Sequence, residues 1–511
     1  MRGFTLFLAT FVLGTALAAP AAAVEQDWVD CGSTGADAQC TTMSVPLDWN
    51  RPNGPAITLA VDRHKANPAT RKGILFLAPG VGFDFVLSGL SRGLFAQMPN
   101  MLRDFDIIGV DPRGGGLHPL YGPQPAPFRT DRVDCTEPVH DPALSSFPRS
   151  QGEYDALVAH NRAFAASCDT PPLGHMDTTA QARDLDAVRE ALGEPTASFF
   201  LYGYSGPLAQ TYASLFPQHI RAMAVDSPVD HSLPSVARVA DYAATVEREF
   251  TRFVEWCDRS PRQPGNPTFP GCELHGQDVL AIYDSVLDKA DTVPVRLDLP
   301  AGPPGPAETV LVRGDDLAFL TEQLLEIGDM PAPYGLGWAN LAFAINEVNT
   351  GRGATVFASV YRYSWGFHDL WNPYRAGGCQ DFPAQVTGFA DLAARERLVA
   401  TLAPHTRGAS QAWDMMTGCI GWPSAGTNPP KPTIVRGAPP ILITGAKGNP
   451  WAPYEGLRLM SAQIENSVLL TYEGDAHIAF LSSECVVRQL ENYLETAVAP
   501  PRGSTCPAIP T

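Results

Sequence analysis

Six short apolar runs limit what this chain can fold into. Such a run, bounded by glycine, proline or acidic turns, is typical of a strand buried on both faces of a sheet. The runs are Gly73–Leu77, Asp106–Val110, Ser198–Tyr202, Ala222–Asp226, Pro439–Gly445 and Ser467–Thr471. Helical periodicity accompanies them in Thr178–Leu192, Pro207–Phe216 and Ser483–Ala497. Strands alternating with helices predict an α/β fold with a mostly parallel, doubly wound sheet.

A long segment separates the fourth of these runs from the fifth. Its periodicity predicts five helices: Ser235–Cys257, Gly276–Ala290, Asp315–Ile327, Trp338–Val348 and Gly388–Leu402. The Pro- and Gly-rich stretch Pro294–Pro306 predicts a loop among them. So long an insertion between late strands predicts a helical cap domain. We therefore expect a signal peptide at 1–23, a first core part at 24–231, the cap at 232–430 and a C-terminal core part at 431–511.

The charge balance excludes some partners. The chain has 36 Lys+Arg against 54 Asp+Glu, a formal net charge of −18. Nucleic acids and anionic lipid surfaces need a basic partner, so we expect neither. The acidic excess itself indicates only solubility.

The N-terminus has the pattern of a secretory signal peptide. Arg2 precedes the apolar Phe4–Leu17, and small residues suitable for cleavage follow at 16–18 and 21–23. The alternative is an uncleaved anchor, but the apolar stretch is shorter than the ~20 residues that a span requires. We therefore expect a secreted protein with no membrane span after cleavage.

The ten cysteines favour disulfides in an oxidising compartment. Spacing does not determine connectivity. Sequence neighbours suggest Cys31–Cys40, Cys135–Cys168, Cys257–Cys272, Cys379–Cys419 and Cys485–Cys506. No Cys-x-x-Cys occurs, and no dinucleotide or phosphate-binding spacing is present, so we expect neither a metal nor another cofactor.

The sharpest chemical motif is Gly203-Tyr204-Ser205-Gly206, between a predicted strand and a predicted helix. A serine on such a turn can be an exposed nucleophile, and the N–H of the next residue can donate to an oxyanion. Ser205 is thus the candidate nucleophile and Gly206 an oxyanion donor. Pro207 stands where the usual pattern has a second glycine. The alternative is an ordinary Ser-Gly-Pro turn at a helix start.

His477 follows the last predicted strand and is the candidate general base. Its acid should follow the preceding strand, but the loop there offers only Asn449, which carries no charge. Asp226, at the end of the fourth run, is the candidate substitute, with Asp230 as a second choice. A turn-forming aspartate is the alternative for Asp226.

A second group of oxyanion donors should follow the first strand. Gly80 and Val81, in Pro79-Gly80-Val81-Gly82, can present backbone N–H groups there, although a plain turn has the same sequence. Arg113, in Asp111-Pro112-Arg113-Gly114, is expected to brace loops.

Together these pieces resemble the α/β-hydrolase fold, and more narrowly the secreted tripeptidyl aminopeptidases of the prolyl-aminopeptidase-like serine peptidases. The resemblance covers nearly the whole mature chain. It rests on Val45–Trp49, Asp111–Gly114, Gly203–Ser205, Thr211–Pro217, Cys419–Pro423, Pro453–Gly456 and Gly474–His477.

The resemblance implies release of short peptides from free N-termini by a Ser/His/Asp triad. It gives Ser205 as nucleophile and His477 as base. The acid falls on Asn449, where relatives have Asp-Pro-x-Thr-Pro, and the Gly-Gly-Pro-Gly oxyanion loop is reduced to Pro79–Gly82. The helix after Ser205 is shorter than in relatives, and an alignment without a gap puts Gly203 at the nucleophile's place.

Two hypotheses therefore stand. The first is a secreted serine hydrolase, an exopeptidase acting through an acyl-enzyme on Ser205, with esterase or acyl-transfer chemistry as a variant. The second is an impaired or non-catalytic member that binds a ligand in the cap cleft. A carboxylate in reach of His477, and His477 in reach of Ser205, would favour the first. In either case the expected partner is a small peptide or acyl compound; the oligomeric state is not indicated.

Overall fold

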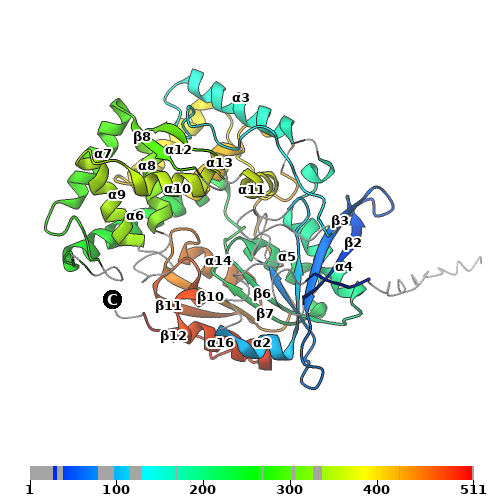
Figure 1. Cartoon of the computed structure of the whole chain (residues 1–511). Coiled ribbons are helices and arrows are strands. Elements are labelled where there is room, and N and C mark those ends of the chain that lie inside the picture. The colour runs from blue at the N-terminus through cyan, green and yellow to red at the C-terminus, as the bar shows by residue number, and fades with distance from the viewer. Residues whose placement is uncertain are drawn as a thin grey trace, which may run out of the picture.

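A ten-stranded sheet forms the centre of the computed structural model, in the order β1-β2-β3-β5-β4-β6-β7-β10-β11-β12 (Figure 1). The model describes residues 27–508 except 32–37, 79–96, 116–127, 169, 264, 266–269, 302–304, 326–336, 367 and 425. The strands are β1 (Val29–Asp30), β2 (Ala38–Pro46), β3 (Ala56–His64), β4 (Ile74–Ala78), β5 (Asp106–Val110), β6 (Ala197–Tyr202), β7 (Ile220–Asp226), β10 (Ile441–Gly448), β11 (Val468–Asp475) and β12 (Thr505–Cys506). The pairs from β5 to β12 are parallel, and those among β1, β2, β3 and β5 are antiparallel. The predicted α/β class is confirmed.

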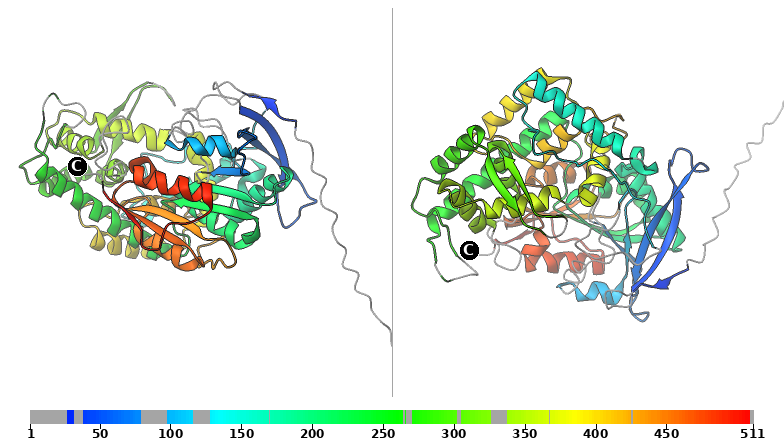
Figure 2. Two further views of the ribbon diagram at one scale, coloured as in Figure 1. Left: turned by 90° about the horizontal axis from the view of Figure 1, so that it is seen from below. Right: turned by 45° about the horizontal axis from the view of Figure 1, so that its top comes forward.

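Helices cover both faces of the sheet because adjacent strand residues point to opposite sides. On one face, Phe200 lies in a buried cluster with residues of α2 (Pro99–Asp104) and α16 (Glu484–Thr496). On the other, its neighbour Phe199 packs with α4 (Thr178–Ala191), α5 (Gly206–Leu215) and α14 (Tyr454–Gln463). The continuous apolar run of β6 is thus explained by burial on two sides. Figure 2 shows the helices that lie on the two faces of the sheet.

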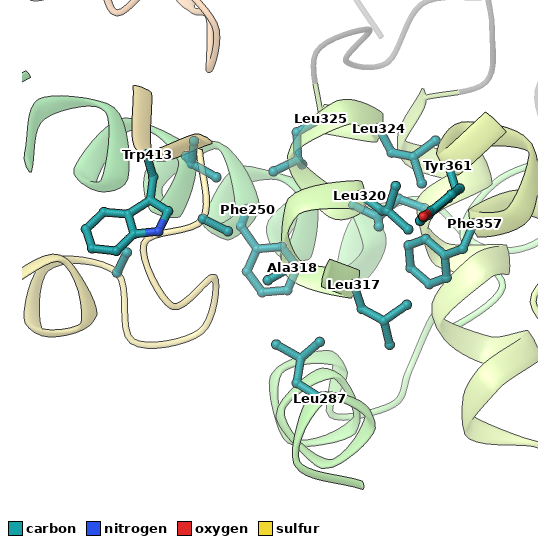
Figure 3. Packing of buried hydrophobic residues seen from close by; sticks show 14 of the residues in the cluster. Phe250, Leu287, Leu317, Ala318, Leu320, Leu324, Leu325, Phe357, Tyr361 and Trp413 are labelled. Carbon is teal, nitrogen blue, oxygen red and sulfur yellow. The ribbon is translucent and has the colours of Figure 1, made fainter. Parts of the chain in front are cut away.

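The segment between β7 and β10 is mainly helical. Its helices are α6 (Ser235–Arg259), α7 (Val279–Thr292), α8 (Gly314–Leu325), α9 (Gly337–Asn349), α10 (Thr355–Gly366), α11 (His368–Asp381), α12 (Phe389–Leu402) and α13 (Gln411–Gly418). They share one apolar core that includes Phe250, Leu317 and Trp413 (Figure 3). Periodicity found α6, α7, α8, α9 and α12 but missed the other three.

Two further details differ from the expectations. The predicted loop Pro294–Pro306 contains β8 (Val295–Leu299), which pairs with β9 (Glu308–Val312) as a hairpin. Alternate hairpin residues are buried against the helices, which the Pro- and Gly-rich composition concealed. The helix α3 (Gln151–Ser167) precedes β6 in sequence but joins the helical region, where Asn161 donates to the carbonyls of Thr417 and Ile420.

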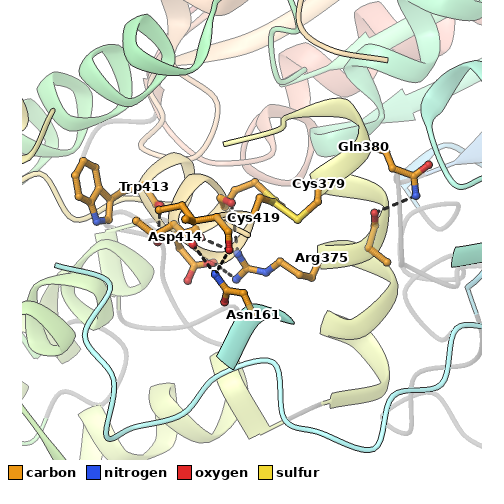
Figure 4. The surroundings of a disulfide bond; sticks show 11 residues. Asn161, Arg375, Cys379, Gln380, Trp413, Asp414 and Cys419 are labelled. Carbon is orange, nitrogen blue, oxygen red and sulfur yellow. Dashed lines mark hydrogen bonds and ion pairs between the residues drawn. A yellow bond between two sulfur atoms is a disulfide. The ribbon is translucent and has the colours of Figure 1, made fainter. Parts of the chain in front are cut away.

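All the cysteine pairs suggested by sequence neighbours are disulfides: Cys31–Cys40, Cys135–Cys168, Cys257–Cys272, Cys379–Cys419 and Cys485–Cys506. Cys379–Cys419 ties α11 to the end of α13 (Figure 4). Among the described residues, no helix is long and apolar enough to span a membrane. In the same part of the chain, no three His, Cys, Asp or Glu side chains gather as metal ligands would. The expected signal peptide at 1–23 lies outside the described residues.

Arg113 braces the loops at the antiparallel edge, as expected. Its guanidinium is fully buried and makes two hydrogen bonds of 2.7 and 2.6 Å to Asp184 of α4. It also donates to the carbonyl of Leu47, while the indole of Trp49 donates to Asp184. The Val45–Trp49 stretch is therefore fixed by a buried ion pair.

Candidate active site

The turn after β6 has its unusual backbone at Gly203. This residue has φ +60°, in the left-handed region that side chains other than glycine rarely adopt. Ser205 has ordinary helical backbone, φ −75° and ψ 0°, and leads directly into α5. A nucleophile elbow holds its nucleophile on the strained residue of a strand-to-helix turn. In this turn that position belongs to Gly203.

His477 faces the same position. A Cβ atom added to Gly203 would lie 3.7 Å from Nε2 of His477 and 3.9 Å from its Cε1. A hydroxyl one bond further out would come within hydrogen-bonding reach of the imidazole. The space in front of His477 is therefore the space that a side chain at residue 203 would enter.

Ser205 makes a different contact. Its buried hydroxyl donates to the carbonyl of Tyr202 at 3.0 Å. No hydrogen bond joins it to His477, although both residues are described. The structure thus brings His477 to Gly203 and not, by any hydrogen bond, to the serine that the motif predicts.

Asn449 supports the loop of His477 through the backbone. Its side-chain N–H donates to the carbonyl of His477 at 2.9 Å, and its Oδ1 accepts from the N–H groups of Trp451 and Ala452 at 3.0 Å each. Nδ1 of His477 is buried and has no hydrogen-bond partner in the described part of the chain. Burial lowers the pKa of His477 to about 3. The imidazole is therefore neutral at ordinary pH, and no acid among the described residues bonds its Nδ1.

Asp226 is not that acid. One of its carboxylate oxygens accepts from the hydroxyl of Thr444, and the other accepts from the N–H of Phe480 at 3.1 Å. Burial raises its pKa to about 6, against these hydrogen bonds. Asp226 joins β7 to β10 and to α15 (Ala479–Ser482), and so positions the segment after His477 without bonding the ring.

Gly206, one of the expected oxyanion donors, takes part in the turn itself. The N–H of Gly206 donates to the carbonyl of Gly203, so it is used within the turn. A Cβ on Gly206 would lie 2.6 Å from Val229 O, so glycine is needed here for close packing against the loop after β7. Gly80 and Val81 lie outside the described residues.

The sequence is similar to several proteins of known type. A family model described as "TAP-like protein" matches residues 403–506. The chain is 26% identical to "Serine protease Hip1" of Mycobacterium tuberculosis, over 94% of this chain and 90% of that protein. It is 27% identical to "Tripeptidyl aminopeptidase" of Streptomyces lividans, over 96% and 89%, and 26% identical to "Carboxylesterase B" of M. tuberculosis, over 96% and 91%.

The chain has an α/β-hydrolase fold and is similar to proteins named tripeptidyl aminopeptidase. Its fold and its relatives are those of serine hydrolases.

The helical region of this hydrolase closes over the elbow with aromatic side chains. Tyr204 packs against Tyr374 of α11 and against Phe382, the residue that follows α11, with ring centroids 4.9 and 5.7 Å apart. The guanidinium of Arg238, on α6, lies 4.0 Å from the Phe382 ring centroid. Sequence reasoning missed these residues because they are far from the elbow in sequence and form no motif.

Two carboxylates meet where α6 reaches the ends of β10 and β11. A Cβ on Gly448 would lie 1.8 Å from Oδ1 of Asp475 and 2.8 Å from Oε2 of Glu249. Arg252 pairs with Asp475 at 2.7 Å and lies 3.9 Å from Glu249. Burial raises the pKa of Glu249 to about 7, with Arg252 opposing the shift and Asp475 adding to it.

We expect Glu249→Gln to remove a pH dependence of stability in this hydrolase. Folding holds the Glu249 proton more tightly than the unfolded chain does, so the stabilisation is present below the ordinary pKa of 4.5 and is lost as the pH rises through about 7. Between pH 4.5 and 8 the wild type should lose on the order of 2–3 kcal/mol relative to the variant. Urea unfolding of both proteins at the two pH values measures this. Parallel pH profiles would contradict the assignment.

Proposed function

We propose that this chain is a secreted serine-hydrolase homologue that binds a peptide or acyl ligand beneath its helical region and forms no acyl-enzyme. The observation that carries the proposal is the glycine at residue 203. An acyl-enzyme needs a nucleophilic side chain in front of the general base. Here the residue facing His477 is Gly203, which has none.

The residue at the place of the triad acid supports the same conclusion. In a serine protease, replacing the triad Asp by Asn costs on the order of 10⁴ in turnover, because the histidine takes the wrong tautomer. Asn449 stands at that place by resemblance, and its amide is occupied by backbone groups. A chain without the nucleophile and the acid lacks the groups that would react with a substrate.

The ligand class follows from the relatives' names. They are called serine protease, tripeptidyl aminopeptidase and carboxylesterase, which act on acyl compounds. Peptides are the first choice, and esters or other acyl compounds are the second. The five disulfides support an oxidising, extracellular location. Within this proposal, 24–231 and 431–511 form the core and 232–430 the cap.

A second candidate function is exopeptidase or esterase activity through Ser205. The relatives' names favour it. This activity requires the Ser205 hydroxyl to break its hydrogen bond to the Tyr202 carbonyl and to form one with His477.

A fluorophosphonate probe separates the two functions because it reacts only with an activated serine. We expect the folded, purified wild type to remain unlabelled, and Ser205→Ala to be indistinguishable from it. A related active tripeptidyl aminopeptidase serves as the positive control for the probe.

Labelling of the wild type that disappears in Ser205→Ala would refute the proposal and make Ser205 the nucleophile. Binding is measured separately, by calorimetry with tripeptides. Absence of both labelling and tripeptide binding would reject the peptide-ligand choice.

A further inference from the structure

A small cavity lies inside the helical region, away from His477. It has a volume of about 20 Å³, enough for one or two waters or the end group of a longer ligand. Its walls come from α8, α10, α11 and α13, and its polar wall residues are Gln323, Ser364, Arg375, Gln411 and Asp414. Ser364 is 3% exposed and Arg375 is 6% exposed. The cavity is thus polar and largely enclosed.

One wall residue of this cavity, and two residues close to wall residues in the sequence or by ring contact, carry buried polar atoms without partners. Nε of Arg375 has no hydrogen-bond partner among the described residues, and the same is true of both side-chain polar atoms of Asn372, three residues earlier in α11. Nε2 of His140 is also unpaired, and this ring stacks on Trp365, another wall residue, at 4.1 Å. Leaving such an atom unpaired costs about 1–3 kcal/mol. An occupant of the cavity that accepts a hydrogen bond from Nε of Arg375 would remove this cost for that atom.

The charges at the cavity are already balanced. The guanidinium of Arg375 pairs with the carboxylate of Asp414 at 2.7 Å and donates to the Asp414 carbonyl at 2.7 Å (Figure 4). Burial lowers the pKa of His140 to about 3, with His160 and Arg375 adding to the shift, so this ring is neutral. A charged occupant would therefore lack a counter-charge. A neutral group that both donates and accepts satisfies the walls.

The cavity is separated from the elbow by one pair of rings. Tyr374 lines the cavity, and its ring packs against Tyr204, with centroids 4.9 Å apart. Tyr204 directly follows Gly203. A ligand held at the elbow can therefore reach the cavity by displacing this pair.

We infer that the cavity is a subsite for a primary carboxamide, such as the side-chain end of asparagine. The carboxamide oxygen would accept from Nε of Arg375, and its NH₂ group would donate to Asp414 or to the oxygen of Gln323. This inference rests on the proposed function, because it names the part of the peptide ligand that the helical region selects.

The test uses tripeptides that differ in one side chain. Calorimetry compares Asn-Ala-Ala, Ala-Asn-Ala and Ala-Ala-Asn with the same peptides carrying Leu in place of Asn. We expect one Asn peptide to bind on the order of tenfold tighter than its Leu counterpart, the value of about one buried hydrogen bond. Ser364→Val fills the cavity and should abolish this preference. Ser359→Val, on the exposed side of the same helix, should retain it.

A second readout does not depend on peptide binding. Crystals are soaked with acetamide and, separately, with acetate. Acetamide in the cavity without acetate supports the subsite. Water alone in the cavity, acetate bound equally well, or equal affinities for Asn and Leu peptides would each overturn it. If Leu peptides bind as tightly as Asn peptides, the carboxamide subsite is refuted and the proposed ligand-binding function stands. If no tripeptide binds, the peptide ligand is refuted, and the acetamide soak alone tests whether the cavity binds a carboxamide.

Discussion

The double variant Gly203→Ser/Asn449→Asp is expected to react with a fluorophosphonate at least about 10²-fold faster than the wild type. The added Cβ lies 3.7 Å from Nε2 of His477, so the new hydroxyl can bond the imidazole. The new carboxylate would lie in the side chain that now contacts the backbone of His477, and Nδ1 of this ring has no partner among the described residues. A serine at φ +60° costs about 1–3 kcal/mol of stability, which nucleophile elbows tolerate. Labelling kinetics on the folded variant measure the effect.

Two controls separate the hydroxyl from the backbone strain. Gly203→Ala/Asn449→Asp places a side chain at the same positive φ but has no hydroxyl, so it should remain unlabelled. The triple variant that adds Ser205→Ala should be labelled as fast as the double variant. A well-folded double variant that stays inert, or one whose labelling depends on Ser205, would show that residue 203 is not the nucleophile's position.

Arg113→Met is expected to lower the free energy of unfolding by about 3–5 kcal/mol, since it leaves a buried carboxylate without its partner. Asp184 is buried at 3% exposure and already has its pKa raised by burial, against Arg113. The lost guanidinium would also free the carbonyls of Leu47 and His175. Urea unfolding at neutral pH measures the loss.

A double-mutant cycle tests whether the ion pair itself is responsible. Asp184→Asn alone should also destabilise the fold, whereas Arg113→Met/Asp184→Asn should cost less than the sum of the two single changes. Arg51→Met, which removes an exposed pair with Asp48, is the matched control and should change the free energy by less than about 1 kcal/mol. A loss below that level in Arg113→Met would refute the bracing role.

Much of this fold could be predicted from the sequence because its signals are local. The apolar runs at β4, β5, β6, β7, β10 and β11 are short and bounded by turns, which is typical of strands buried on both faces. The disulfides join sequence neighbours, so spacing suggested the pairs that formed. The hairpin β8–β9 and the helices α10, α11 and α13 were missed because their burial is set by distant partners.

The sequence by itself determined that a strand–turn–helix with Gly203 and Ser205 exists, and that Asn449 and His477 follow late strands. Only the tertiary structure decided which of these residues meet. His477 faces Gly203 because the positive φ of the turn directs residue 203, and not residue 205, toward the end of β11. Asp226 accepts hydrogen bonds from Thr444 and Phe480, and Thr444 lies beside it because β7 and β10 pair. A reacting site is a set of distances between remote residues, and local patterns in the sequence do not contain them.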